Sequence, residues 1–141
     1  MSASHFRELE VWKAAMELAK STYEISARFP AEERYGLTRQ LLRAAVSIPS
    51  NIAEGNARQS RADYARFVSI ASGSTAELLT QLQLAVELGL AEDGQVEPVR
   101  DLAESVGRML YRLHKALLRQ VPPRSPVPGP RSPDPEFLEG V

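Results

Sequence analysis

The chain has 141 residues, which is enough for one domain, and 43% of them are hydrophobic while 25% are charged. Its 17 Lys and Arg against 18 Asp and Glu give a net charge of −1, which excludes a protein whose bulk charge alone would hold nucleic acid. With no cysteine and 2 histidines, the composition excludes disulfide scaffolds, thiolate metal sites and imidazole-rich metal sites.

The sequence also indicates where the protein resides. Its N-terminal residues lack the apolar region of a secretory signal. No apolar run approaches the roughly 20 residues that cross a bilayer. We therefore expect a soluble cytoplasmic protein that has no membrane partner.

Apolar residues recur at three- and four-residue steps through four segments, a spacing typical of amphipathic helices. The first segment ends at Phe29-Pro30, because proline disfavours a helical residue before it. The second segment contains Pro49, so we expect a kink near residues 45–49. The predicted helices cover about residues 7–28, 33–57, 61–88 and 95–120.

The later segments have recognisable ends. Ser60 is placed as an N-cap, with Asp63 in the first turn of the third helix, and Gly89 is placed to end that helix. No window shows two-residue alternation, so we predict no sheet. Short connections between four helices favour an all-α, up-down-up-down antiparallel four-helix bundle in residues 1–121.

The remaining segment, residues 122–141, holds seven of the ten prolines and two copies of Pro-Arg-Ser-Pro. Proline prevents a regular helix there, and little apolar surface is available for burial. We therefore predict a disordered, extended Pro-rich C-terminal tail. The alternative is a ligand for an aromatic-lined groove on a partner.

A polar stripe follows the second predicted helix at helical spacing: Gln40, Arg43, Ser47, Asn51, Glu54 and Arg58. Pro49 lies within this segment and frees the carbonyl near Ala45, which Ser47, Ser50 or Asn51 could bond. One interpretation is that the stripe faces solvent and its Ser and Asn residues repair the backbone. The other is that it faces a second subunit or a ligand.

Six small residues, Ala71 to Ala76, follow one another in the third predicted helix. Gly73 at their centre costs about 1 kcal/mol relative to alanine. Small side chains let a neighbouring backbone approach, so we predict close packing here, within the subunit or between subunits. An anion nest is disfavoured, because amides in the middle of a helix are already hydrogen-bonded.

Basic residues gather in two places. On the fourth helix they step by four, three and four residues, which forms a narrow arc of Arg108, Arg112, Lys115 and Arg119. Residues 34–66 hold a second excess of arginine, which includes Arg39 and Arg43. The two interpretations are solvated helix faces and contacts to RNA or DNA.

The motifs of common enzymes are missing from the sequence. It has no Gly-rich phosphate loop, no nucleophile elbow and no Glu-x-x-His pair of a di-iron bundle. We therefore expect that the protein is not an enzyme and that it uses no metal or other cofactor.

Four motifs in order resemble a known family: Phe6 to Ala14, Phe29 to Leu37, Gln40 to Gly55 and Ile70 to Leu78. They are similar to small bacterial four-helix bundle proteins encoded in intervening sequences of 23S ribosomal RNA genes, over about residues 6–118. The resemblance implies a homopentameric, barrel-like ring with a central channel. It also implies kinship in fold to the accessory variability protein of diversity-generating retroelements, which binds nucleic acid and a reverse transcriptase through a basic surface.

Within these motifs, eight residues are candidates for the kink or for contacts between helices or subunits: Trp12, Gln40, Ser47, Pro49, Asn51, Glu54, Gly55 and Gly73. Our leading hypothesis is a non-enzymatic, self-assembling bundle that acts as a scaffold or accessory protein, with other copies of itself as partners. The alternative is an accessory module that binds RNA, DNA or a nucleic-acid-handling protein through its basic stripes.

Deletion of residues 122–141 should change the free energy of unfolding by no more than about 0.5 kcal/mol, because the segment has little apolar surface to bury. Urea unfolding of the full chain and of the shortened chain, followed by circular dichroism, measures this difference. A large loss of stability would instead mean that the tail packs on the bundle.

Overall fold

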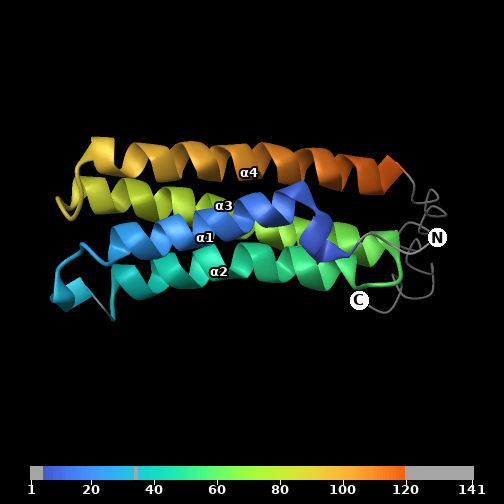
Figure 1. The fold of residues 1–141 in the computed structure, drawn as a ribbon, viewed down its shortest axis with the longest axis horizontal. Helices are drawn as coiled ribbons and strands as arrows, with labels where there is room; N and C mark the ends of the chain where they lie inside the picture. The colour runs from blue at the N-terminus through green and yellow to red at the C-terminus, as the bar shows by residue number, and fades with distance from the viewer. Residues whose placement is uncertain (1–4, 34, 120–141) are drawn as a thin grey trace, which may run out of the picture.

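The computed structural model describes residues 5–33 and 35–119, and these form four long helices lying side by side (Figure 1). The all-α prediction is confirmed, and the described residues contain no strand. The predicted Pro-rich tail at 122–141 lies outside the described residues. In chain order the elements are η1 (Phe6–Glu8), α1 (Glu10–Ser26), η2 (Ala31–Glu33), α2 (Leu37–Asn56), α3 (Arg61–Glu87) and α4 (Asp93–Arg119).

Each helix packs against two others, and the order around the bundle is α1, α2, α3, α4 and back to α1. Short connections make consecutive helices antiparallel, as the sequence predicts. The connection between α2 and α3 lies at one end of the bundle, which we call the turn end. The connections between α1 and α2 and between α3 and α4 lie at the opposite end, which we call the loop end (Figure 1).

The helix ends differ from the expected ranges by a few residues. The first segment is divided, because Leu9 has an extended backbone (φ −72°, ψ 126°) between η1 and α1. The second begins at Leu37 rather than near Glu33, since residues 31–33 form the separate turn η2. Gly89 follows α3 with a φ of 74°, a left-handed conformation that ends helices and that glycine adopts without strain.

The core is built from the inward face of every helix. Leu18, Leu41, Leu78 and Leu110 are fully buried, one from each of α1 to α4. Burying a side chain of this size stabilises the folded state by about 1.5–3 kcal/mol. Within residues 5–33 and 35–119, no helix combines the length and the apolar character needed to cross a membrane.

The two glycines singled out in the sequence have opposite surroundings. A Cβ atom on Gly55 would lie 2.8 Å from Cβ of Phe67 and 3.1 Å from Cδ1 of Tyr64, so α2 and α3 approach closely there. A Cβ atom on Gly73 would meet nothing within 4 Å. Close packing within the subunit is therefore not found at Gly73 itself, whose side of α3 faces away from α2 and α4, but Ala71, Ser74 and Thr75 of the same stretch are buried. Contact between subunits at Gly73 stays a prediction.

These surroundings predict opposite effects for the same substitution. Gly55→Ala should destabilise the fold by about 1–3 kcal/mol, because the added methyl group has no space beside Phe67. Gly73→Ala, the matched control, should stabilise it by about 0.5–1 kcal/mol, since alanine is the better helix former in open space. Thermal and urea unfolding of the two variants checks both signs, and a stabilised Gly55→Ala variant would contradict the close approach.

Candidate functional site

The polar stripe of α2 lies partly in solvent and partly against α3. Gln40, Arg43 and Glu54 are exposed, whereas Ser47 and Asn51 are half-buried. The structure therefore divides the stripe: its middle packs within the subunit, and contact of its exposed part with a second subunit or a ligand stays a prediction.

The half-buried part of the stripe joins the two helices. The Ser47 and Ser74 hydroxyls lie 2.8 Å apart, and one donates to the other across the interface. Nδ2 of Asn51 donates to the Ser47 carbonyl at 2.8 Å and to the Ser47 hydroxyl at 2.9 Å. Such bonds contribute about 0.5–1.5 kcal/mol each and fix the axial position of α2 against α3.

The expected repair of the backbone next to Pro49 is not made by the described side chains. α2 continues through the buried Pro49 as one helix. None of the described side chains bonds the carbonyl of Ala45, because Asn51 reaches Ser47 instead. Trp12, the remaining family-motif candidate on α1, is half-buried and meets Phe6 edge to face, with ring centroids 5.3 Å apart.

The basic arc of α4 is placed as the spacing predicts. Its four members, Arg108, Arg112, Lys115 and Arg119, are all exposed. The opposite side of the helix is buried, with Val106 at 0% and Leu117 at 5% exposure. The ammonium of Lys115 lies 5.7 Å from the centroid of the Tyr111 ring, which keeps this charge close to an aromatic face.

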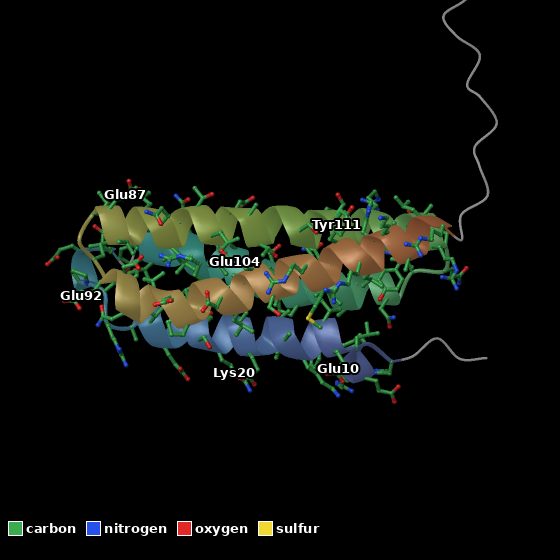
Figure 2. All side chains as sticks on the ribbon, turned by 90° about the horizontal axis from the view of Figure 1, so that it is seen from above. Glu10, Lys20, Glu87, Glu92, Glu104 and Tyr111 are labelled. Atoms are coloured by element: carbon green, nitrogen blue, oxygen red, sulfur yellow. The ribbon has the colours of Figure 1, made fainter. Side chains whose placement is uncertain are left out.

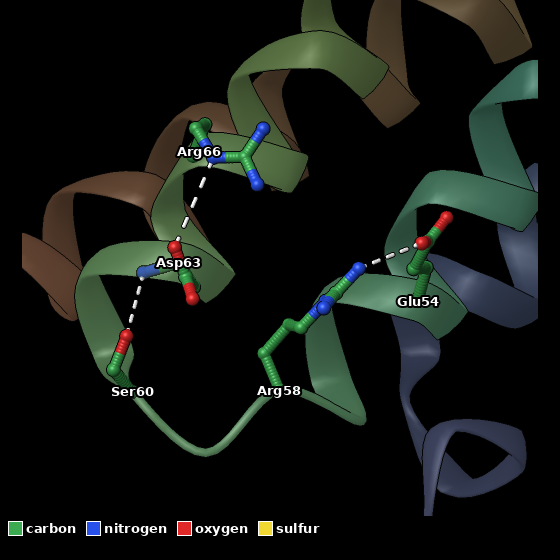
Figure 3. A network of polar contacts seen from close by, with 5 residues as sticks. All are labelled: Glu54, Arg58, Ser60, Asp63 and Arg66. Atoms are coloured by element: carbon green, nitrogen blue, oxygen red, sulfur yellow. Dashed lines mark hydrogen bonds and ion pairs between the residues drawn. The ribbon is translucent and has the colours of Figure 1, made fainter.

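A second group of arginines surrounds the connection between α2 and α3 (Figure 3). Arg58 pairs with Glu54 at 2.9 Å, and Nε of Arg66 lies 3.9 Å from the Asp63 carboxylate. Both guanidinium groups lie over the ring of Phe67, at 4.8 Å and 4.6 Å from its centroid. In the same place the Ser60 hydroxyl accepts from the Asp63 N–H at 3.1 Å, which is the N-cap the sequence predicts.

The charges of the bundle are separated along its axis. A cross-section of the bundle near its middle passes through the Ser47–Ser74 contact and the neighbouring Gly107. It divides the described residues into two halves, which we call the turn half (5–15, 49–74 and 107–119) and the loop half (16–33, 35–48 and 75–106). The turn half has nine basic and four acidic residues, a net charge of +5. The loop half has five basic and eleven acidic residues, a net charge of −6. Figure 2 shows Glu87 and Glu92 at the loop end and Tyr111 toward the turn end.

This separation changes the grouping of the arginines that the sequence suggests. Arg39 and Arg43 lie in the first two turns of α2, in the acidic half of the bundle. Arg58, Arg61 and Arg66 lie in the same half as the α4 arc. The arginine excess in residues 34–66 is therefore not one zone, because α2 carries its members to opposite ends.

A hollow of about 370 Å³ lies at the turn end, and its lining includes Arg58, Arg61, Tyr64 and Leu117. Burial raises the pKa of the half-buried Tyr64 phenol, although a hydrogen bond from Asn56 acts in the opposite direction. The phenol is therefore neutral at pH 7. Among the residues that the structure describes, no three His, Asp or Glu side chains lie together as metal ligands.

Two further hollows lie on opposite long faces of the bundle. The first, of about 490 Å³, lies over α1 and α2, and its lining includes Tyr23, Leu42 and Val46. The second, of about 410 Å³, lies over α3 and α4, and its lining includes Leu79 and Tyr111. We call these surfaces the α1–α2 face and the α3–α4 face.

The helical spacing in the sequence does not predict these two faces. Tyr23 continues the apolar spacing of the first predicted helix, but its side chain is 52% exposed, and Tyr111 is 64% exposed. The available signal was the presence of large apolar side chains such as Val46 and Tyr111 outside the inward stripes.

Comparison with known proteins gives a family and a fold. The sequence model of the 23S rRNA-intervening sequence protein family matches residues 7–112. A crystal structure of a protein of unknown function from the S23 ribosomal protein family of Bacteroides thetaiotaomicron is 25% identical, with a TM-score of 0.69. That match covers 74% of this chain and 98% of the other. No curated protein matches the chain in sequence. The chain belongs to the 23S rRNA-intervening sequence protein family.

Proposed function

We propose that this chain is a non-enzymatic, self-assembling bundle that acts as a scaffold or accessory protein. The observation that carries the proposal is the pair of hollowed apolar faces on opposite sides of one small bundle. Tyr23 and Val46 are 52% and 43% exposed on the α1–α2 face, and Tyr111 is 64% exposed on the α3–α4 face. Apolar surface of this kind gains free energy when another protein surface covers it.

A second copy of the chain supplies such a cover on both faces, because every copy carries both. The proposed assembly is a homopentameric ring. The number five follows from the resemblance to the bundle proteins of ribosomal RNA intervening sequences. The proposed role is structural: the assembled ring presents one set of surface groups several times to a partner.

A second candidate function is binding of nucleic acid, either directly or together with a nucleic-acid-handling protein such as a reverse transcriptase. The observation that favours it is the net charge of +5 in the turn half, with nine basic against four acidic residues. A ring of parallel copies would bring several basic ends together, and several weak contacts to one polyanion strengthen each other.

Purified protein at micromolar concentration should show one discrete oligomer in light scattering after size exclusion and in native mass spectrometry. The expected mass is five times the chain mass of 15.6 kDa. Buried apolar faces should hold this oligomer together when the salt concentration is raised. A strict monomer at this concentration would rule out the assembly.

If the turn half binds RNA or DNA, changing Arg108, Arg112, Lys115 and Arg119 together to Gln should weaken that binding. For every phosphate that the protein then fails to neutralise, the slope of log affinity against log salt should become shallower by about 0.7–0.9. Fluorescence anisotropy with mixed RNA and duplex DNA at several salt concentrations measures both quantities. A control variant, Lys20→Gln with Arg28→Gln, removes two basic charges from the loop half and should leave binding nearly unchanged. Equal binding by all three proteins would remove the α4 arc from consideration.

A further inference from the structure

We infer that the hollow at the turn end is a binding site for one nucleotide unit, with an apolar floor for the base and two arginines for the phosphate. The inference does not depend on self-assembly. It rests on the second candidate function and deepens it, because it names the unit of RNA or DNA that the site would hold. A free nucleotide carries the same chemical groups.

The hollow lies where the ends of all four helices meet. Its volume of about 370 Å³ falls within the range of about 300–1,000 Å³ that is usual for sites of small molecules. Leu9 lines it just before α1, Asn56 at the end of α2, Arg61 at the start of α3 and Leu117 near the end of α4. The site is therefore fixed by the packing of the bundle.

The apolar part of the lining consists of three leucines and one aromatic ring. Leu117 is 5% exposed, whereas Leu9 and Leu113 are half-buried against the core. The ring of Tyr64 joins them, because a Cβ atom on Gly55 would lie 3.1 Å from its Cδ1 and the glycine leaves that space to the ring. A nucleic-acid base gains free energy on such a surface, by losing contact with water and by stacking.

The polar part of the lining can hydrogen-bond the edge of a base. Asn56 and Gln59 carry amides, and each amide has both a donor and an acceptor. Nδ2 of Asn56 donates to the Tyr64 phenol oxygen at 3.4 Å. Burial raises the pKa of that phenol, so the group keeps a proton that it can donate to a ligand. Base edges carry donors and acceptors side by side, whereas an acyl chain would leave these groups without partners.

The charged part of the lining consists of Arg58 and Arg61, and no acidic residue lines the hollow. Arg58 is held by Glu54 at 2.9 Å and by the ring of Phe67 (Figure 3), and a group that is already in position costs less entropy to bind. Arg61 takes part in none of the ion pairs between described residues. Guanidinium groups bind phosphate oxygens through paired hydrogen bonds.

Another hollow of the same chain shows that two arginines alone do not make this site. The hollow over α1 and α2 is lined by Arg39 and Arg43 and by no acidic residue, but its lining contains no amide side chain. These arginines also lie in the loop half, whose net charge is −6, whereas the turn half has +5. The combination of amides, arginines and positive surroundings is found at the turn end.

Calorimetric titration of the full chain with adenosine 5′-monophosphate tests the inference. At low salt we expect one equivalent bound per chain, with a dissociation constant of about 1 mM or below. Adenosine and inorganic phosphate, which each carry half of the proposed contacts, should bind at least about tenfold more weakly. Phosphate that binds as tightly as the nucleotide would show a simple anion site and overturn the inference. Adenosine that binds as tightly would overturn the role of the arginines.

Two substitutions locate the bound nucleotide. Arg61→Gln should raise its dissociation constant about tenfold, and Tyr64→Phe, which removes one hydroxyl, about threefold. The matched control, Arg39→Gln, removes an arginine from the other hollow and should leave the constant unchanged. Circular dichroism checks that each variant is folded. A folded Arg61→Gln variant that binds as well as the original chain would overturn the inference.

A short single-stranded RNA with a 5′-phosphate separates the two sources of the nucleotide. Binding tighter than that of the mononucleotide, and weakened by Arg61→Gln by the same factor, indicates a nucleotide of a strand. Equal binding of both probes indicates a free nucleotide, and both results support the site. If mixed RNA binds but the mononucleotide does not bind at about 10 mM, the inference is overturned while binding of nucleic acid by the exposed arginines stands. If neither binds, both are overturned.

Discussion

The close approach of α2 and α3 at Gly55 is the constraint on which the rest of the bundle depends. A side chain there would force the two helices to shift, because the Cβ position would lie 2.8 Å from Cβ of Phe67. This contact fixes how α3 leaves the connection at residues 57–60. It also places the Phe67 ring where both Arg58 and Arg66 lie over it.

The same interface sets the axial positions of the helices, and with them the positions of the residues on the outer surfaces. Further along it, the Ser47–Ser74 bond fixes the axial position of α2 against α3. The packing of Gly107 beside Thr75 in turn fixes the axial position of α4 against α3. Residues on opposite faces of the molecule are therefore held in a defined register. Small polar residues serve this purpose well, since they bond each other across a narrow gap and leave the helices close.

Much of the fold could be predicted from the sequence, because helical periodicity and capping are local properties. The spacing of apolar residues predicts the buried side of each helix, as at Leu41 and Leu78, and Ser60 caps α3 as expected. The role of a glycine depends instead on what lies opposite it. Nothing local distinguishes Gly55, which is needed for close packing, from Gly73, which faces open space.

The candidate surfaces were harder to predict for a related reason. Arg39 and Arg58 belong to one arginine-rich stretch of sequence, yet α2 separates them by its length of 20 residues, about 30 Å. Tyr23 continues the period of the apolar stripe on α1, but it lies at the stripe's edge, where no neighbouring helix covers it. Periodicity indicates the direction in which a side chain points, whereas exposure depends on the shape of the neighbours.

The separation of charge has a consequence for the molecule in solution. In an antiparallel bundle the dipoles of the four helices largely cancel, so the side chains alone determine the electric moment along the axis. With +5 on one half and −6 on the other, the nearly neutral chain is a strong electric dipole. Such a molecule turns in the field of a charged object before the two touch, so it arrives in one orientation.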